Sequence, residues 1–362
     1  MLQELTAFTT LTALSVRQSP CYAHLPAAEL AGLSTVTALR SIKLEGKFSS
    51  QLPPQAFNQL QQLTRLELKK INEPIEDQLG WDHLSACREL RLLSLRCAVP
   101  CLSGEQALAV WQHLQQLSIW PACSCANAGF WHILPQLASL TKLAISCSAA
   151  RQRELSQLLS NVLPACLRLA DLKPCGYNRP ALPQLATTLT WLYLEQAMEL
   201  QQLPSADMLR SLGLKRCRLL GDAASGAVMR HLTALQLVGC DLQRLPPDLT
   251  APPAVEMLDL SSNELSDLPQ QLACLPCLRK LLLRKCKLRQ VPLVLGCGLA
   301  VRLEHLNLSY NENLVITDEG LEVVSSLTAL TYLNLHVIGG VTVVGGFKAV
   351  RHVLPASCVL AT

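Results

Sequence analysis

Three consecutive stretches of the chain repeat one pattern, and this pattern decides the fold. They read LTALQLVGCDLQRLP at 232–246, VEMLDLSSNELSDLP at 255–269 and LRKLLLRKCKLRQVP at 278–292. Counted from the first residue of each stretch, an aliphatic residue stands at positions 1, 4, 6, 11 and 14, and a cysteine or asparagine at position 9. Proline follows at position 15, and each copy begins 23 residues after the previous one. Such a period, repeated with the same chemistry, indicates a solenoid of stacked coils.

Each position of the pattern has a physical role. Positions 4 and 6 lie on one face of a strand, whereas positions 3, 5 and 7 lie on the opposite, free face. Position 9 turns the chain inward, where asparagine can both donate and accept hydrogen bonds and cysteine is a weaker substitute. Because one coil cannot bury its own aliphatic face, neighbouring coils must stack, and their strands are expected to form one parallel sheet.

The same frame extends outward over nearly the whole sequence. It predicts fourteen coils, which open at Leu11, Leu39, Leu63, Leu90, Leu114, Leu140, Leu167, Leu189, Leu209, Leu232, Val255, Leu278, Leu303 and Leu330. We predict one domain over 1–362, with longer helix-backed coils at 1–188, short Leu-Pro coils at 189–300 and C-terminal coils at 301–362. Helical patterns at 105–117 and 152–163 support the first part, and the Leu-Pro and Val-Pro pairs favour turns and short helices in the second. The registers at Leu11, Leu39 and Leu167 follow the pattern least closely.

The coils resemble the leucine-rich repeat superfamily, with middle coils like the intracellular plant and Ras-group type and final coils like the cysteine-containing type. The resemblance implies an α/β horseshoe, with one parallel sheet on its concave side and helices and turns on its convex side. It also implies a monomeric scaffold that binds other proteins, in signalling for example. The sequence contains no F-box, kinase, nucleotide-binding or Toll-type module, and its opening in a coil fits a fragment of a longer protein. Members in green algae are often assigned to the ciliary axoneme, so the resemblance offers that location.

Composition favours an aliphatic repeat protein of the cell interior. Half of the 362 residues are hydrophobic, 16% are charged and 4% are aromatic. Residues 1–16 have no basic segment before their apolar residues, so we expect no signal peptide. No run of eighteen apolar residues occurs, and we therefore predict an intracellular, cytoplasmic protein without a membrane span. Four of the sixteen cysteines, Cys175, Cys217, Cys240 and Cys286, stand at position 9. We therefore expect reduced, buried thiols and no disulfide framework.

Motifs for catalysis or cofactor binding are absent from the sequence. No glycine-rich phosphate loop stands between a strand and a helix. Cys274, Cys277, Cys286 and Cys297 could be drawn as zinc ligands, but Cys286 belongs to the repeat pattern and the spacing matches no usual finger. The histidines have no nucleophile and orienting acid at a recognisable spacing. We therefore predict no enzyme, no metal and no cofactor.

Charge is distributed unevenly over the predicted coils. Positions 2, 3, 5, 7 and 8 of all fourteen coils comprise 70 residues, and they hold 18 of the 31 Lys and Arg but 7 of the 27 Asp and Glu. This surface therefore carries 18 minus 7, or +11, although the whole chain carries +4. The residues predicted to bind a partner are Lys69, Lys70, Arg96, Lys173, Trp191, Tyr193, Lys215, Arg216, Arg284 and Lys285. The alternative is that these basic residues form a solvated face without a ligand.

Three functions are compatible with this surface. The first is a non-catalytic scaffold that receives an acidic protein, because a positive field steers encounter and exposed aromatic residues provide contact area. A second is a substrate-recognition module of a ubiquitin ligase or signalling complex. A third is nucleic-acid binding, which the net charge of only +4 and the lack of closely spaced stacking aromatics disfavour.

Overall fold

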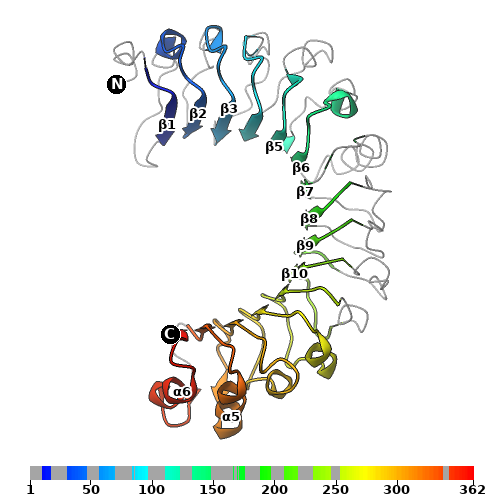
Figure 1. Ribbon diagram of the computed structural model, residues 1–362, viewed down its shortest axis with the longest axis vertical. Coiled ribbons are helices and arrows are strands. Elements are labelled where there is room, and N and C mark those ends of the chain that lie inside the picture. Colours follow the sequence, from blue (N-terminus) through cyan, green and yellow to red (C-terminus); the bar gives the residue numbers. More distant parts are fainter. Residues whose placement is uncertain are drawn as a thin grey trace. The chain divides into compact units, whose positions relative to one another are not determined.

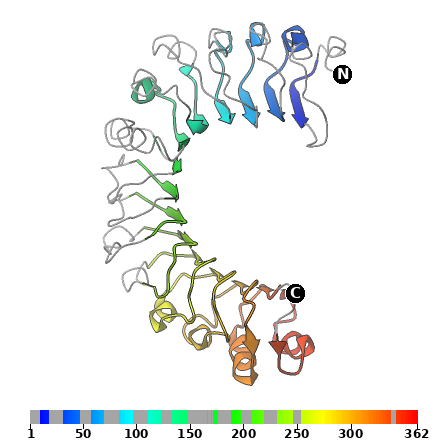
Figure 2. The same cartoon turned by 180° about the vertical axis from the view of Figure 1, so that it is seen from behind.

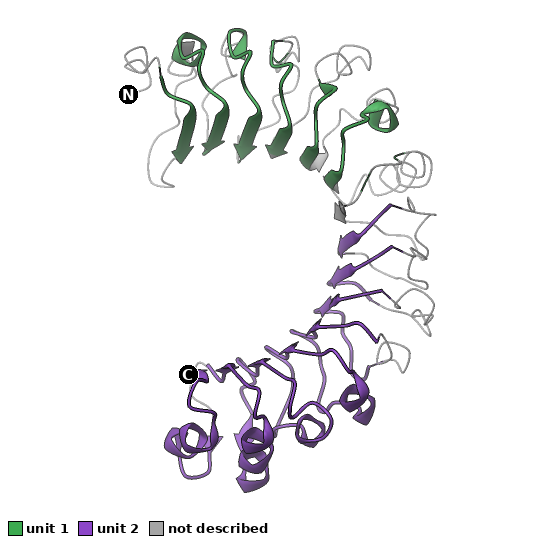
Figure 3. Cartoon of the chain, viewed as in Figure 1, with its two compact units in different colours: residues 1–176 green, residues 177–362 purple. Residues whose placement is uncertain are grey.

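The structure is a computed structural model. It describes residues 10–17, 31–46, 57–69, 84, 86–96, 111–122, 133–147, 166, 169, 171–175, 188–196, 208–218, 231–245, 253–336 and 342–362. The chain forms two compact units, residues 1–176 (unit 1) and 177–362 (unit 2), which are coloured green and purple in Figure 3. The single-domain organisation stays a prediction.

Unit 1 is a row of parallel strands, one from each coil (Figure 1). The strands are β1 (Ala13–Arg17), β2 (Ser41–Glu45), β3 (Arg65–Lys69), β4 (Leu92–Arg96), β5 (Gln116–Ala122), β6 (Lys142–Cys147) and β7 (Asp171–Cys175). Position 4 of each coil is in register with position 4 of the next, as Ile42 is with Leu66 and Leu66 with Leu93. Two short 3₁₀ helices, η2 (Ala31–Thr35) and η5 (Leu134–Gln136), lie among the described connections. The predicted parallel register of the first six coils is confirmed.

Two sequence-based expectations for unit 1 are wrong. Leu143 of β6 pairs with Leu172, and Leu169 and Leu172 are both buried, so this coil opens at Leu169 and not at Leu167. Lys173 consequently moves to position 5 and Cys175 to position 7, away from the cysteine position. The helix predicted at 105–117 cannot reach its expected end, because β5 already begins at Gln116, and the helix at 152–163 lies outside the described residues.

Unit 2 continues the same architecture with shorter coils. Its main row of parallel strands is β8 (Trp191–Glu195), β9 (Ser211–Lys215), β10 (Ala234–Val238), β11 (Met257–Asp259), β12 (Lys280–Leu282), β13 (His305–Asn307), β15 (Tyr332–Asn334) and β17 (Val359–Ala361). The frame of fourteen coils did not predict β17, whose Leu360 is in register with Leu333. A serine, Ser357, stands where leucine or valine opens the other coils, so the repeat pattern does not reveal this strand.

Side chains at position 5 end several strands of unit 2 early. Oδ1 of Asn307 accepts a hydrogen bond from the backbone N–H of Ser309 at 2.9 Å. Asp259 and Asn334 make the same bond to the N–H two residues further on. Such a bond stabilises a local turn of the backbone, so the strand does not continue beyond this residue. The three strands that end in these residues, β11, β13 and β15, have three residues each, whereas β8, β9 and β10 have five.

The described helices of unit 2 lie on the side of the coils away from the strands. Short 3₁₀ helices η10 (Gln270–Cys274) and η11 (Leu293–Gly296) begin directly after Pro269 and Pro292, as the Leu-Pro pattern predicts. The α-helices α5 (Asp318–Ser326) and α6 (Phe347–Val353) back the last coils, and Figures 1 and 2 show both away from the strands. A small second sheet pairs β14 (Val315–Ile316) with β16 (Thr342–Val343). These helices confirm the change of style predicted for the final coils.

The core is a stack of leucines closed by a polar ladder at position 9. Leucines at positions 1, 4 and 6 are almost fully buried, for example Leu232, Leu235 and Leu237 at 0% exposure. Nδ2 of Asn263 donates to the carbonyl of Leu237 in the preceding coil at 2.6 Å, and its Oδ1 accepts from the N–H of Cys240 at 2.8 Å. This arrangement satisfies backbone groups that stacking buries, so the predicted role of position 9 is confirmed.

At position 8, the ladder of backbone hydrogen bonds between neighbouring coils continues beyond the strands of unit 2. Six consecutive coils have left-handed backbone there, with φ between 53° and 62°, at Gln196, Arg216, Gly239, Ser262, Lys285 and Tyr310. Each of these residues donates its N–H to the position 7 carbonyl of the next coil at 2.7–2.9 Å. The left-handed conformation turns the chain out of the strand while the backbone ladder continues. The side chains of these residues take no part in that ladder.

Candidate partner-binding surface

The candidate site is the strand face, the surface that side chains at positions 3, 5 and 7 form together with the neighbouring position 8. Lys69, Trp191, Tyr193, Lys215, Arg216, Arg284 and Lys285 all lie on it as predicted. Arg96 and Lys173 belong to described strands, but their side chains are outside the described part, as is the whole of Lys70. In the count over positions 2, 3, 5, 7 and 8, the register correction at Leu169 removes Arg168, so the excess of basic residues becomes 17 minus 7, or +10.

In unit 1, Lys69 belongs to an ion-pair cluster centred on Glu67. The Nζ of Lys69 lies 3.1 Å from Oε2 of Glu67, and the guanidinium of Arg65 donates to Oε1 at 2.5 and 2.8 Å. The Glu67 side chain is only 7% exposed. Burial by itself raises the pKa of Glu67, but the hydrogen bonds and charges of Arg65 and Lys69 outweigh burial and hold this pKa below its ordinary value of 4.5. Lys69 is therefore partly neutralised.

At the start of unit 2, two aromatic rings form a platform. The rings of Trp191 and Tyr193 are stacked, with centroids 5.8 Å apart and an angle of 9° between their planes. Gly213, opposite Tyr193 in the register of β8 and β9, makes this arrangement possible, because a β-carbon there would overlap Cδ2 of the Tyr193 ring. The ring of Tyr193 thus covers the neighbouring strand where a side chain is missing. Both aromatic residues are half-buried.

The predicted basic residues beside this platform differ in their availability. Nζ of Lys215 lies 2.9 Å from Oε1 of Glu195, so these two residues form an ion pair across β8 and β9. Arg216 is exposed and has no ion pair among the described residues. Its left-handed backbone is held by a hydrogen bond from its N–H to the carbonyl of Val238 at 2.8 Å. Arg216 is consequently the more available cation of the two.

A second cluster in unit 2 joins three coils side by side. The guanidinium carbon of Arg284 lies 4.3 Å from the centroid of the Tyr310 ring, which is a cation–π distance. The Tyr310 ring also contacts His336, with 5.5 Å between the ring centroids and an angle of 66° between the ring planes. Tyr310 and His336 are absent from the residues predicted to bind. Tyr310 stands at position 8 of its coil and His336 at position 7, so the repeat pattern could have placed both among the residues predicted to bind.

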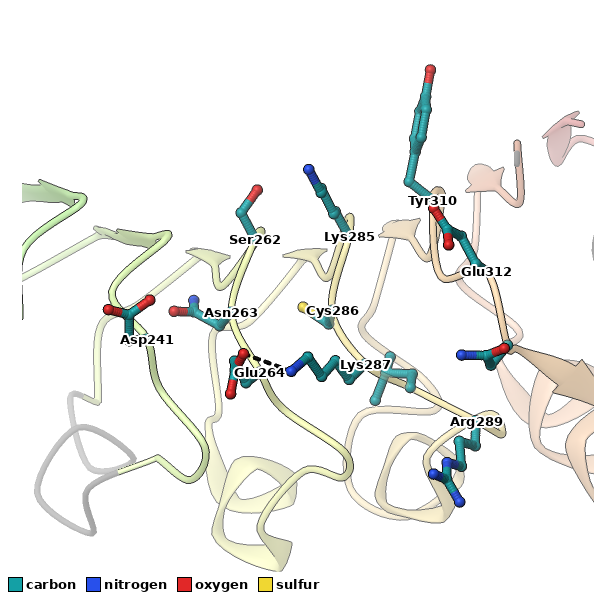
Figure 4. Close-up of a pocket in the computed structure, with 12 residues that line it drawn as sticks. Asp241, Ser262, Asn263, Glu264, Lys285, Cys286, Lys287, Arg289, Tyr310 and Glu312 are labelled. Atoms are coloured by element: carbon teal, nitrogen blue, oxygen red, sulfur yellow. Dashed lines mark hydrogen bonds and ion pairs between the residues drawn. The ribbon is translucent and has the colours of Figure 1, made fainter. Parts of the chain in front are cut away.

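Beside this cluster, the edge of unit 2 contains a groove of about 500 Å³. Figure 4 shows that Ser262, Lys285 and Tyr310 point to the same side, away from Glu264 and Lys287. The Nζ of Lys287 pairs with Oε1 of Glu264 at 2.6 Å, so these two charges are already matched. The side chains at position 8 therefore form a rim between the strand face and the groove.

The described residues include no group of three or more His, Cys, Asp or Glu that could hold a metal ion. Cys274, Cys277 and Cys297 are exposed, whereas Cys286 is buried in the ladder. Burial raises the pKa of the Cys286 thiol to about 11 and that of Cys240 to about 12. In the part of the chain that the structure describes, no helix has the length and apolar character needed to cross a membrane.

Comparison with solved structures supports the fold. An internalin of Listeria monocytogenes is 16% identical, with a TM-score of 0.48 and coverage of 99% of this chain and 88% of that chain. A leucine-rich repeat protein of Leptospira interrogans is 18% identical, with a TM-score of 0.48 and coverage of 100% and 98%. Toll of Drosophila, solved in complex with Spatzle, is 18% identical, with a TM-score of 0.53 and coverage of 90% of this chain and 42% of that chain. The similarity to Toll has the highest TM-score of the three, and at 18% identity it concerns the fold alone.

Sequence comparison places the family signal in the stretch with the most regular repeats. The family described as "Leucine rich repeat" matches residues 230–288, which include the coils opening at Leu232 and Val255. No curated protein matches the chain in sequence. The repeated pattern and the parallel strands of both units give the chain the fold of a leucine-rich repeat solenoid, and residues 230–288 match the leucine-rich repeat family itself.

Proposed function

We propose that the chain is a protein-interaction scaffold whose strand face binds an acidic segment of another protein. The observation that carries the proposal is that two glutamates of this face, Glu67 and Glu195, form ion pairs, while several basic residues of the face form none among the described residues. Glu67 is held by Arg65 and Lys69, and Glu195 by Lys215. A surface left with unpaired cations attracts an oppositely charged partner and steers its approach.

Pairing within the face leaves its positive charges in defined places in unit 2. Arg216, Arg284 and Lys285 are exposed and form no ion pair among the described residues. Glu304, an acidic residue beside the second cluster, is paired with Arg279. Among the described residues of unit 2, these three cations therefore remain available after the ion pairs are counted.

Aromatic residues accompany the cations on the same face and support a protein partner. The stacked pair of Trp191 and Tyr193 offers a rigid surface of large area, and such residues often dominate the free energy of protein interfaces. These two rings stack on each other, and the Tyr310 ring is in contact with Arg284 and His336. Nucleic-acid bases need free aromatic faces for stacking, so this arrangement favours a protein.

A charge-reversal experiment tests the proposal. The double variant Arg216→Glu/Lys285→Glu changes two exposed residues whose backbones, but not side chains, contribute to the ladder. We expect it to fold normally and to bind a labelled poly-glutamate peptide about tenfold more weakly, with a shallower dependence on salt. Fluorescence anisotropy at two salt concentrations measures both quantities. Trp191→Ala should weaken binding with less change in the salt dependence.

The matched control is Arg218→Glu/Arg244→Glu, which changes the net charge equally at exposed residues beyond position 9. It should bind poly-glutamate nearly as well as the original chain does. Equal loss of binding in both double variants would show that net charge alone matters and would end the proposal. Tighter binding of polyuridylate than of poly-glutamate would favour nucleic acid instead.

A further inference from the structure

We infer that Arg284, held on the ring of Tyr310, is the receptor for a phosphate monoester on a side chain of the bound protein. The inference rests on the proposed function and specifies the chemical group that the partner presents at this point. Stacking at 4.3 Å limits the motion of the Arg284 guanidinium while leaving its N–H groups at the edge of the plane. A guanidinium fixed in this way loses less entropy when it forms two parallel hydrogen bonds to an anion.

Backbone contacts fix the parts of this receptor relative to one another. The N–H of Tyr310 donates to the carbonyl of His336 at 2.8 Å, and that of Lys285 donates to the carbonyl of Ser309 at 2.9 Å. His336 is in turn held by its N–H bond to Oδ1 of Asn334. Three neighbouring coils therefore contribute side chains whose backbones are tied together, which provides the rigidity that a specific site needs.

The charge around Arg284 matches a dianion better than a single carboxylate. Its own coil also carries Lys280 and Lys285, and among the described residues none of these three cations forms an ion pair. Asp259 on the preceding coil, which accepts a hydrogen bond from the N–H of Ser261 at 3.0 Å, brings a single negative charge against these three cations. A phosphate monoester brings close to two negative charges and three acceptor oxygens at neutral pH, whereas Asp or Glu brings one charge and two oxygens.

The cluster of Arg284, Tyr310 and His336 differs from the platform of Trp191 and Tyr193 in a way that suits phosphate. Near Trp191 and Tyr193, Lys215 forms an ion pair with Glu195, so only Arg216 is left to bind an anion there. Near Tyr310, Lys280, Arg284 and Lys285 form no ion pair among the described residues, whereas Arg279 pairs with Glu304 and Lys287 with Glu264. The two clusters therefore divide the strand face of unit 2 into an aromatic platform and an anion receptor.

The test uses immobilised peptide libraries that share their flanking residues and differ at one central residue. This residue is phosphoserine, glutamate or serine. The original chain should bind the phosphoserine library at least about tenfold more tightly than the glutamate library, since hydrogen bonds to a charged group contribute that much. Arg284→Lys keeps the charge but removes the bidentate fork, so this preference should disappear. Tyr310→Leu should reduce it, because the guanidinium then loses its support.

Arg244→Lys provides the control, since Arg244 is exposed and lies away from the strand face. It should retain the full preference for phosphoserine. Equal binding of the phosphoserine and glutamate libraries would overturn the inference and leave the proposed function standing, and so would a preference that survives Arg284→Lys. Binding of neither acidic library would overturn both. Circular dichroism of each variant verifies that the fold is retained.

Discussion

Asn263 and Cys286 occupy the same position in consecutive coils and make the same donor bond, but Asn263 alone also accepts two short backbone bonds. The thiol of Cys286 donates to the carbonyl of Leu260 at 3.4 Å, just as Nδ2 of Asn263 donates to that of Leu237 at 2.6 Å. Oδ1 of Asn263 additionally accepts from the N–H groups of Cys240 and Leu242 at 2.8 and 3.2 Å. Cysteine at this position is therefore a partial replacement for asparagine.

Replacing Asn263 by cysteine should destabilise unit 2 by about 1 to 3 kcal/mol, because buried N–H groups of the preceding coil lose a strong acceptor. The midpoint of urea unfolding measures the loss. Ser266→Ala, a change at an exposed residue of the same coil, should leave the midpoint nearly unchanged. If Asn263→Cys has no larger effect than Ser266→Ala, the ladder does not depend on the acceptor.

Thiol reactivity should divide the cysteines of unit 2 into two groups. Cys240 and Cys286 are buried with pKa values of about 12 and about 11, while Cys274, Cys277 and Cys297 are exposed. Only the thiolate is alkylated, and its fraction falls tenfold for each unit by which the pKa rises, so the buried pair should react at least about a hundredfold more slowly. Mass spectrometry of chain alkylated under native conditions reports each site. Fast labelling of Cys240 would contradict its place in the ladder.

The same buried thiols should make the fold sensitive to alkali. Above the ordinary thiol pKa of 9.0, the unfolded chain loses the proton of Cys240 while the folded chain keeps it up to about 12. The unfolded state then binds fewer protons, so the free energy of unfolding falls as pH rises, by about 1.4 kcal/mol per pH unit for each such thiol. Urea unfolding at pH values on either side of 9.0 should show a shallower fall for Cys240→Ala. Equal slopes would refute this linkage.

A single methyl group at Gly213 should disturb the aromatic platform. Its β-carbon would overlap the ring of Tyr193, which must then rotate and lose its stacking on Trp191. Because a side chain can move aside, Gly213→Ala should cost less than about 1 kcal/mol of stability. It should nevertheless change the near-ultraviolet circular dichroism and weaken binding. In a Tyr193→Ala background the same substitution should have little further effect, and a full additional effect would argue against the contact.

In unit 1, Glu67 should contribute acid-sensitive stability. Its pKa in the folded chain lies below 4.5, so its contribution is complete above that value and is lost as pH falls through the lower folded pKa. Glu67→Gln should cost about 1 to 3 kcal/mol at neutral pH, since Arg65 and Lys69 lose a charged acceptor, and should flatten the acid limb of the stability curve. Unfolding at graded acidic pH measures both effects. An unchanged acid limb would show that other groups control it.

Sequence reasoning located the strands well because the aliphatic pattern is read directly from residue spacing. It failed at the coil opening at Leu169, where Leu167 and Leu169 are both leucines and only the pairing of Leu143 with Leu172 decides between them. It also failed at β17, where Ser357 replaces the opening leucine. A register can be inferred from one chain only when the alternatives differ in chemistry.

The candidate site was harder to predict than the fold. Spacing showed which residues share the strand face, but it did not show that Lys69 and Lys215 are paired with Glu67 and Glu195. It also did not show the contact between Arg284 and Tyr310, since side-chain conformation decides such contacts across coils. Positions define a surface, whereas the neighbours of each charge determine what that surface can bind.

The left-handed turn at position 8 has a consequence for how this protein can change. The turn uses only backbone atoms to join each coil to the next, and six different amino acids occupy it: Gln196, Arg216, Gly239, Ser262, Lys285 and Tyr310. A column that accepts glutamine, arginine, glycine, serine, lysine and tyrosine in identical backbone geometry places little constraint on its side chains. Mutation, whether natural or designed, can therefore rewrite this column one coil at a time and give the same scaffold a new ligand.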